Sequence, residues 1–127
     1  MPHPQLDRFQ LKFKPLTARE SKLRIEVDHV APGTPPPAMS AGAAATVAEA
    51  AKRIRAAREA GAPVMMGFGA HTIKNGLGPV LIRLLEAGWV QHLATNGAGI
   101  IHDWEFAFQG QSSEDVRTNV AQGTFGM

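Results

Sequence analysis

Apolar residues recur at two different spacings along the chain, and each spacing predicts a different kind of element. At 46–61 they fall at every third or fourth position while charged residues cover the opposite face, which predicts an amphipathic helix. The same helical spacing recurs at 77–85 and 100–108. A glycine follows each of the three stretches, and glycine commonly ends a helix.

Short apolar runs alternate with these helical stretches. Residues 63–68 and 90–95 form two such runs, and we predict a buried strand in each. A strand–helix–strand unit of this size is typical of a right-handed crossover between parallel strands. Because parallel strands need cover on both faces, the helices at 46–61 and 100–109 are expected to form the second covering layer. We therefore predict an α/β fold, a partial Rossmann-like three-layer arrangement with a short parallel sheet and flanking helices.

The first part of the chain lacks this regular alternation. Residues 1–45 are expected to form an extended, weakly structured arm with a proline-rich linker, followed by a partial Rossmann-like domain at 46–127. Within the arm, residues 22–27 alternate cleanly between polar and apolar, which predicts a half-buried strand. Three consecutive prolines at 35–37 exclude a helix or a central strand and favour a spacer.

A last helix is expected near the end of the chain. Ser112 or Ser113 can cap its N-terminus by accepting a hydrogen bond from a backbone N–H. Glu114 and Asp115 would then lie in its first turn, where the helix dipole favours negative charge.

Composition and charge narrow the class of protein. The 127 residues fit one domain, and the net charge of +2 comes without a basic cluster interleaved with aromatics, so no nucleic-acid partner is expected. No apolar run is long enough to span a bilayer and no secretory signal opens the chain, so we expect a cytoplasmic protein with no membrane partner. The absence of cysteine excludes disulfides and thiolate metal sites.

The apolar content consists largely of small residues. Twenty alanines and 13 glycines leave few large side chains for a core. We therefore expect a homo-oligomer, at least a dimer, with the 100–108 helix or the 1–30 arm at its interface.

Two glycine-rich turns, at 67–76 and 95–99, follow the predicted parallel strands. The carboxyl ends of adjacent parallel strands lie side by side, so we expect Gly69 and Gly97 to lie close together. Each turn leads into a helix N-terminus, where backbone N–H groups favour a phosphate or carboxylate. We expect a Cβ at Gly97 to crowd its turn. The first turn departs from the dinucleotide pattern G-x-G-x-x-G, because Thr72 replaces the last glycine.

Polar side chains near these turns offer a different possibility. His102 and Glu105 are three residues apart on a predicted helix and therefore share a face. Together with His71 and Asp103 they could serve a small hydrolase or a metal enzyme, although the H-E-x-x-H spacing is absent. The plain alternative is that these histidines form local hydrogen bonds at a turn or a helix start.

Four segments, at 15–22, 67–76, 93–103 and 112–116, together resemble a known family. They are similar to the deoxyhypusine synthase family, and more closely to its bacterial deoxyhypusine-synthase-like branch, whose sequence motifs are close to GAHxIKxG, NGAGxIHDxE and SEDV. The resemblance implies a Rossmann-like domain that assembles into homotetramers with sites at subunit interfaces. It also implies NAD as the cofactor, and transfer of an aminobutyl group from spermidine, or a related polyamine, through an enzyme imine.

The family's two NAD-contacting loops correspond to the two glycine-rich turns. The resemblance therefore implies a cofactor-binding role for these residues: Gly69, Ala70, His71, Asn75, Thr95, Asn96, Gly97, Ala98, His102 and Asp103. His102 stands where the family has a glutamate that contacts the ribose.

The resemblance also implies that this chain corresponds to the N-terminal part of such a protein. The imine-forming lysine lies further along the family sequences, and Lys74 does not match it. We therefore expect a fragment that binds a nucleotide at most and is catalytically incomplete, and we assign no catalytic residue and no metal ligand. The alternatives are a non-catalytic α/β binding or assembly module, and the hydrolase or metal enzyme described above.

Overall fold

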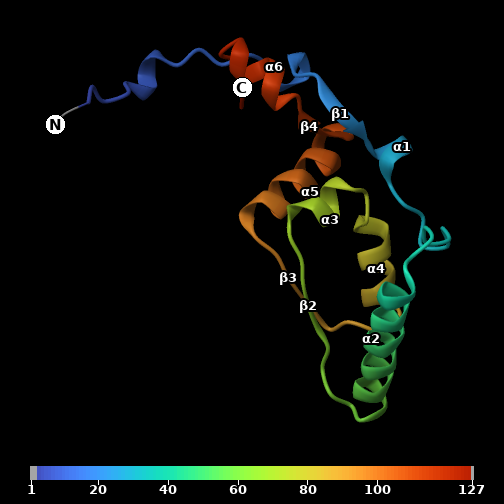
Figure 1. Ribbon diagram of the computed structural model, residues 1–127. Helices are drawn as coiled ribbons and strands as arrows, with labels where there is room; N and C mark the ends of the chain where they lie inside the picture. The colour runs from blue at the N-terminus through green and yellow to red at the C-terminus, as the bar shows by residue number, and fades with distance from the viewer. Residues whose placement is uncertain (1–2, 127) are drawn as a thin grey trace.

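The computed structural model describes residues 3–126 and shows a mixed α/β protein (Figure 1). Its elements follow one another in this order: 3-10 turns at Arg8–Gln10 and Leu16–Ala18, β1 (Ser21–Arg24), α1 (Ile25–Asp28), α2 (Ala41–Glu59), β2 (Met65–Gly67), α3 (Ala70–Lys74), α4 (Gly78–Glu86), β3 (His92–Ala94), α5 (Gly97–Gln109), β4 (Gln111–Glu114) and α6 (Val116–Ala121). No helix within 3–126 is long and apolar enough to cross a bilayer.

The parallel strand pair predicted from the sequence is confirmed. β2 and β3 pair in parallel, with Met66 opposite Leu93, and α3 and α4 lie in the connection between them. The predicted glycine stops are also confirmed, because Gly61, Gly88 and Gly110 all adopt a left-handed φ just beyond their helices. The spacing of apolar residues did not predict α3, a short helix inside the first glycine-rich turn.

A second sheet, which the sequence did not predict, joins the arm to the end of the chain. β1 pairs antiparallel with β4, placing Leu23 opposite Ser112. The strand that the sequence predicts within the arm at 22–27 is therefore present, and it begins one residue earlier, at Ser21. The predicted strand also ends early, at Arg24, because the Arg24 N–H donates to the Asp28 carboxylate at 2.7 Å and the chain turns into α1.

The expected caps of the last helix are also wrong. Ser112 and Ser113 lie in β4 and are buried, because β4 pairs with β1 and the Ser112 hydroxyl donates to the Glu105 carboxylate. Asp115 is the N-cap of α6 instead, and its side chain accepts from the Thr118 N–H at 3.0 Å.

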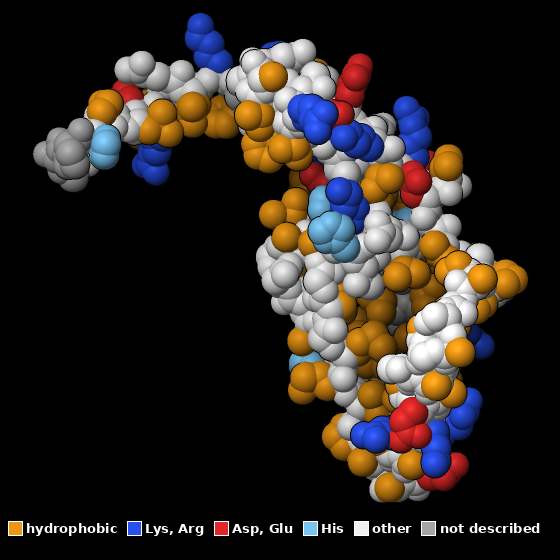
Figure 2. All heavy atoms as spheres, viewed as in Figure 1, with side chains coloured by type: hydrophobic (Ala, Val, Ile, Leu, Met, Phe, Trp, Pro, Cys, Tyr) orange, Lys and Arg blue, Asp and Glu red, His pale blue; other side chains and the backbone are white. Residues whose placement is uncertain are grey.

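Helix α2 begins at Ala41 and not at residue 46, so it takes up part of the expected linker. The Ser40 hydroxyl caps it by accepting from the Ala43 N–H, and the alanines that follow favour the helix. Periodicity missed this turn because small exposed alanines provide no contrast between apolar and polar faces. Helix α2 flanks β2 and α4 across a hollow lined mainly by apolar side chains, visible in Figure 2 between the helices and the strands.

The hydrophobic core is small. Ile73, Leu81 and Phe106 form its buried cluster, against which Leu23 and Met66 pack. The N-terminal arm leads away from this core, and hydrophobic side chains are spread over the surface (Figures 1 and 2). The described fold is therefore held mainly by the packing of α3 against α5, of α5 against β4 and of β1 against β4.

Gly76 provides a test of the loop geometry. Its φ is +78°, and a Cβ there would collide with the backbone carbonyl of Asp28. We expect Gly76→Ala to lower the free energy of unfolding by about 2 kcal/mol or more, because strain and the collision add. Gly69→Ala is the matched control, since open space surrounds Gly69 and its backbone is extended; it should change stability by less than about 0.5 kcal/mol. Equal losses in urea unfolding would contradict this geometry.

Candidate functional site

The two glycine-rich turns adjoin at the carboxyl ends of β2 and β3, as the sequence predicts. The Phe68 N–H donates to the Ala94 carbonyl at 2.9 Å, and the Thr95 hydroxyl donates back to the Phe68 carbonyl at 2.9 Å. Gly69 precedes α3 and Asn96 precedes α5, so both helices begin at the same edge of the strand pair. This edge is the place where ligands bind in open α/β sheets.

The close approach in the second turn occurs at Gly99, and the expectation that it occurs at Gly97 is wrong. A Cβ on Gly97 would meet nothing within 4 Å, and its φ is not left-handed. A Cβ on Gly99 would collide with the Thr95 hydroxyl, which is already held by the neighbouring strand. Gly99 is therefore the position at which a side chain would push the turn apart.

Backbone donors remain available at the start of α5. The Asn96 side chain accepts from the Gly99 N–H at 3.0 Å, which caps one of the first N–H groups of the helix. The N–H groups of Gly97 and Ala98 have no partner within the described residues. Both residues are exposed, so these two donors face solvent at the positive end of the helix dipole.

The family resemblance implies ten cofactor-binding residues, and most of them lie at the surface around these turns. The exposed ones are Gly69, His71, Asn75, Thr95, Asn96, Gly97, Ala98 and Asp103, and the half-buried ones are Ala70 and His102. Beneath the turns lies a mainly apolar cavity of about 180 Å³, whose lining includes Thr95, Gly99 and Asp103. His102 does not line this cavity.

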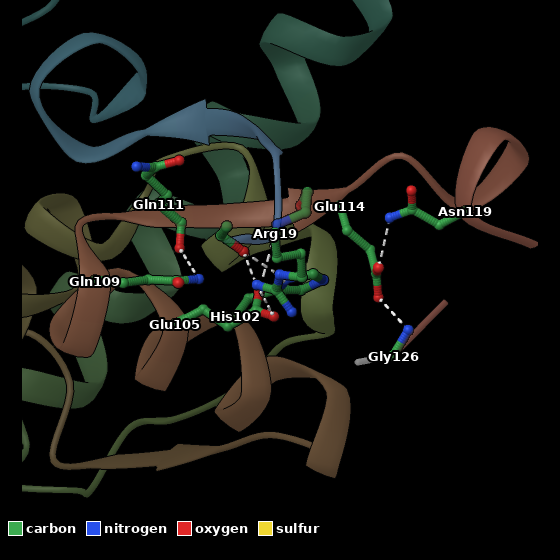
Figure 3. A network of polar contacts seen from close by, with 10 residues as sticks. Arg19, His102, Glu105, Gln109, Gln111, Glu114, Asn119 and Gly126 are labelled. Atoms are coloured by element: carbon green, nitrogen blue, oxygen red, sulfur yellow. Dashed lines mark hydrogen bonds and ion pairs between the residues drawn. The ribbon is translucent and has the colours of Figure 1, made fainter. Parts of the chain in front are cut away.

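His102 belongs instead to a polar network centred on the Glu105 carboxylate (Figure 3). Glu105 Oε1 pairs with the Arg19 guanidinium at 2.7 Å. Glu105 Oε2 accepts from the Ser112 hydroxyl at 2.6 Å and from the Ser113 N–H at 3.3 Å. His102 Nδ1 lies 2.8 Å from Ser112 Oγ and 3.3 Å from Glu105 Oε2. The predicted pairing of His102 and Glu105 on one helix face is confirmed.

The environment of Glu105 favours its charged form. Burial by itself raises the pKa of this carboxyl, but hydrogen bonds from Ser112, Arg19 and the Ser113 N–H, together with the Arg19 charge, outweigh it. The pKa of Glu105 therefore lies below its ordinary value of 4.5. At neutral pH the network contains a buried carboxylate that is both paired and hydrogen-bonded.

The network does not have the geometry of a Ser-His-Glu catalytic triad. Ser112 is fully buried, and its hydroxyl meets the same imidazole nitrogen, Nδ1, that approaches Glu105. A catalytic triad needs the serine and the carboxylate on opposite ring nitrogens. Nor do the residues described in the structure bring three His, Asp or Glu side chains together to hold a metal ion. We therefore interpret the network as a structural connection between the arm and the domain.

Sequence reasoning missed three members of this network, namely Arg19, Ser112 and Ser113. Arg19 lies 86 residues before Glu105, and only the pairing of β1 with β4 brings them together. Ser113 adopts a φ of +67°, unusual for a residue other than glycine, while its N–H donates to Glu105. No local pattern signals either feature.

Comparisons with known proteins add no assignment, because no family model, curated protein or solved structure matches the chain. The class that the structure itself defines is a mixed α/β protein with two adjoining glycine-rich turns.

The Arg19–Glu105 pair leads to a first prediction about the network. Arg19→Met leaves the buried Glu105 carboxylate without its cation, so the free energy of unfolding should fall by about 3 kcal/mol. Lys22→Met is the control, because both side chains of the Lys22–Asp115 pair are exposed to solvent and its removal should lower the free energy of unfolding much less. Similar losses for both variants in urea unfolding would show that the arm is not held by the buried pair.

The pKa of Asp115 leads to a prediction about the stability of the fold at acid pH. A hydrogen bond from the Thr118 N–H and the contact with Lys22 lower the pKa of Asp115 from 3.8 to about 2. A lowered folded pKa means that the ionised form stabilises the fold, fully above pH 3.8 and progressively less as the pH falls toward about 2. Asp115→Asn keeps a capping oxygen but cannot titrate, so its stability should depend less on pH in this window. Parallel pH profiles of unfolding for the two proteins would contradict the assignment.

Proposed function

We propose that this chain is the nucleotide-binding part of a deoxyhypusine-synthase-like protein, with a partial Rossmann-like fold, and that it binds NAD across the two glycine-rich turns. The observation that carries the proposal is the junction of these turns at the carboxyl ends of a parallel strand pair, where Thr95 bonds to Phe68. In Rossmann-type domains the nucleotide lies at this edge.

The phosphates of the cofactor would lie at the start of α5. The free N–H groups of Gly97 and Ala98 can donate to a pyrophosphate, and the dipole of this 13-residue helix favours negative charge there. The open space around Gly97 allows a ligand to reach the backbone. These features fit the phosphate half of NAD.

The sugar of the cofactor requires a different residue from the one that the resemblance indicates. His102 is held at Nδ1 by Ser112 and Glu105, on a different side of α5 from the cavity beneath the turns. Asp103 is exposed, lines that cavity, and carries oxygens that can accept from ribose hydroxyls. We therefore assign ribose recognition to Asp103.

The proposal assigns binding to this chain but no chemical step. NAD would supply hydride transfer in the intact protein, where a polyamine would be the substrate. The lysines of this chain do not match the imine-forming lysine of the family, so no residue of this chain is assigned to aminobutyl transfer.

A charge placed at the start of α5 tests the proposal. Ala98→Glu should favour the helix through its dipole but repel phosphates, so the Kd for NAD should rise by about tenfold or more. Ala43→Glu places the same charge at the start of α2 and is the control. Calorimetric titration of NAD into the three proteins measures the effect. No binding by the unaltered chain, or equal binding by all three proteins, would refute the proposal.

Assembly is a second candidate function, supported by the exposure of large apolar side chains. Leu6, Phe9 and Phe13 on the arm are each more than 70% exposed. An assembly module would associate without binding NAD, so the titration separates the two candidates.

A further inference from the structure

A second cavity lies on a different side of α5 from the glycine-rich turns. It measures about 290 Å³ and is bounded by α3, α5, β4 and α6, together with the segment after α6. Among the described residues, its lining shares no member with that of the cavity beneath the turns. Small-molecule sites commonly measure about 300–1,000 Å³, so a ligand that fits this cavity is small.

Two opposite charges line this cavity without neutralising each other. Lys74, the last residue of α3, forms no ion pair and no side-chain hydrogen bond within residues 3–126. Glu114, the last residue of β4, accepts from the Asn119 side chain at 2.8 Å and from the Gly126 N–H at 2.9 Å, but no cation of the described chain pairs with it (Figure 3). One ammonium and one carboxylate therefore face the same space, and neither has a counter-charge.

The other ionisable side chains in the wall are already paired. Glu105 is neutralised by Arg19 at 2.7 Å. The single hydroxyl proton of Ser112 goes to Glu105, so the contact of 2.8 Å between His102 Nδ1 and Ser112 Oγ requires the ring nitrogen to donate. The neutral His102 ring then carries its proton on Nδ1. Its Nε2, for which the described residues offer no partner, is left as a hydrogen-bond acceptor.

Ser113 adds a buried hydroxyl to the same wall. Its residue is only 7% exposed, and its Oγ has no hydrogen-bond partner in the part of the chain that the structure describes. A buried hydroxyl without a partner costs free energy, and a polar ligand in the cavity offers it one. Ile101 and Val116 supply apolar wall beside these polar groups, and each is more than half exposed.

We propose that this cavity binds an α-amino acid with an apolar side chain. Its carboxylate pairs with Lys74 and accepts from the Ser113 hydroxyl, and its ammonium donates to Glu114 and to His102 Nε2. A zwitterion supplies both missing counter-charges at once, whereas a simple anion or a simple amine leaves one of the two charges unpaired. The apolar side chain covers the exposed hydrocarbon of the wall. This site is separate from the proposed nucleotide edge.

Leucine and two analogues test the ligand class. The amine 3-methylbutylamine is leucine without its carboxylate, and 4-methylpentanoate is leucine without its ammonium. Calorimetric titration should give a Kd for leucine of about 1 mM or tighter, and each analogue should bind at least about tenfold more weakly. No binding of leucine at about 10 mM, or an analogue that binds as tightly as leucine, would overturn the proposal.

Lys74→Met tests the carboxylate end. It should raise the Kd for leucine by about tenfold or more and change that for 3-methylbutylamine by less than about twofold, because the amine has no carboxylate to lose a partner. Lys52→Met is the matched control, since Lys52 is exposed on α2 and lies outside the cavity. Equal effects of the two variants on leucine would contradict the assignment of Lys74.

Glu114→Gln tests the ammonium end. Glutamine keeps an oxygen that can accept from Asn119 but removes the charge, so leucine should bind about tenfold more weakly or worse while 4-methylpentanoate binds no more weakly. Glu59→Gln, at the exposed end of α2, is the control. A Glu114→Gln variant that binds leucine as the unaltered chain does would overturn the proposal.

Ala98→Glu separates this site from the nucleotide edge. The variant alters the start of α5, away from the lining of the second cavity, so the Kd for leucine should stay within about twofold of its original value. A tenfold loss of leucine binding in Ala98→Glu would place the amino acid at the glycine-rich turns and overturn the proposal, whatever the result with NAD.

Discussion

The buried carboxylate of Glu105 organises the part of the structure on which the other features depend. A charge removed from water is costly unless it is paired and hydrogen-bonded, and Glu105 obtains both from Arg19, Ser112 and Ser113. These partners come from the arm and from β4. One side chain of α5 therefore holds the first and the last parts of the chain against the same helix.

The same contact fixes the rotation of α5 about its own axis. With Glu105 directed into the network, Gly99 and Asp103 face the cavity beneath the glycine-rich turns, and Trp104 and Phe108 face solvent. The candidate cofactor edge and the exposed apolar residues are thus on two different faces of α5, and the face that carries Glu105 sets the direction of both. Tilting or rotating α5 would disturb both, which links the arm to the site through a contiguous set of contacts.

The fold achieves this with a small core. Three buried side chains, Ile73, Leu81 and Phe106, form the central cluster, and the two sheets have two strands each. Such a chain gains little from burial within itself. Specific polar contacts such as those of Glu105 therefore contribute a larger share of its stability than they would in a well-packed domain of the same length.

The sequence by itself determined the features that depend on neighbouring residues. The spacing of leucines in α4, the apolar runs of β2 and β3 and the glycines that end the helices are local signals, and the parallel crossover follows from their order. The adjoining turns were predictable for the same reason. Tertiary structure alone decided the pairing of β1 with β4, the burial of Ser112 and the partner of Glu105, because residues 86 positions apart leave no periodic signal along the chain. Tertiary structure also decided that Gly99, and not Gly97, is the glycine at which a side chain would collide. The colliding group is the Thr95 side chain, which is held in place by its hydrogen bond to Phe68.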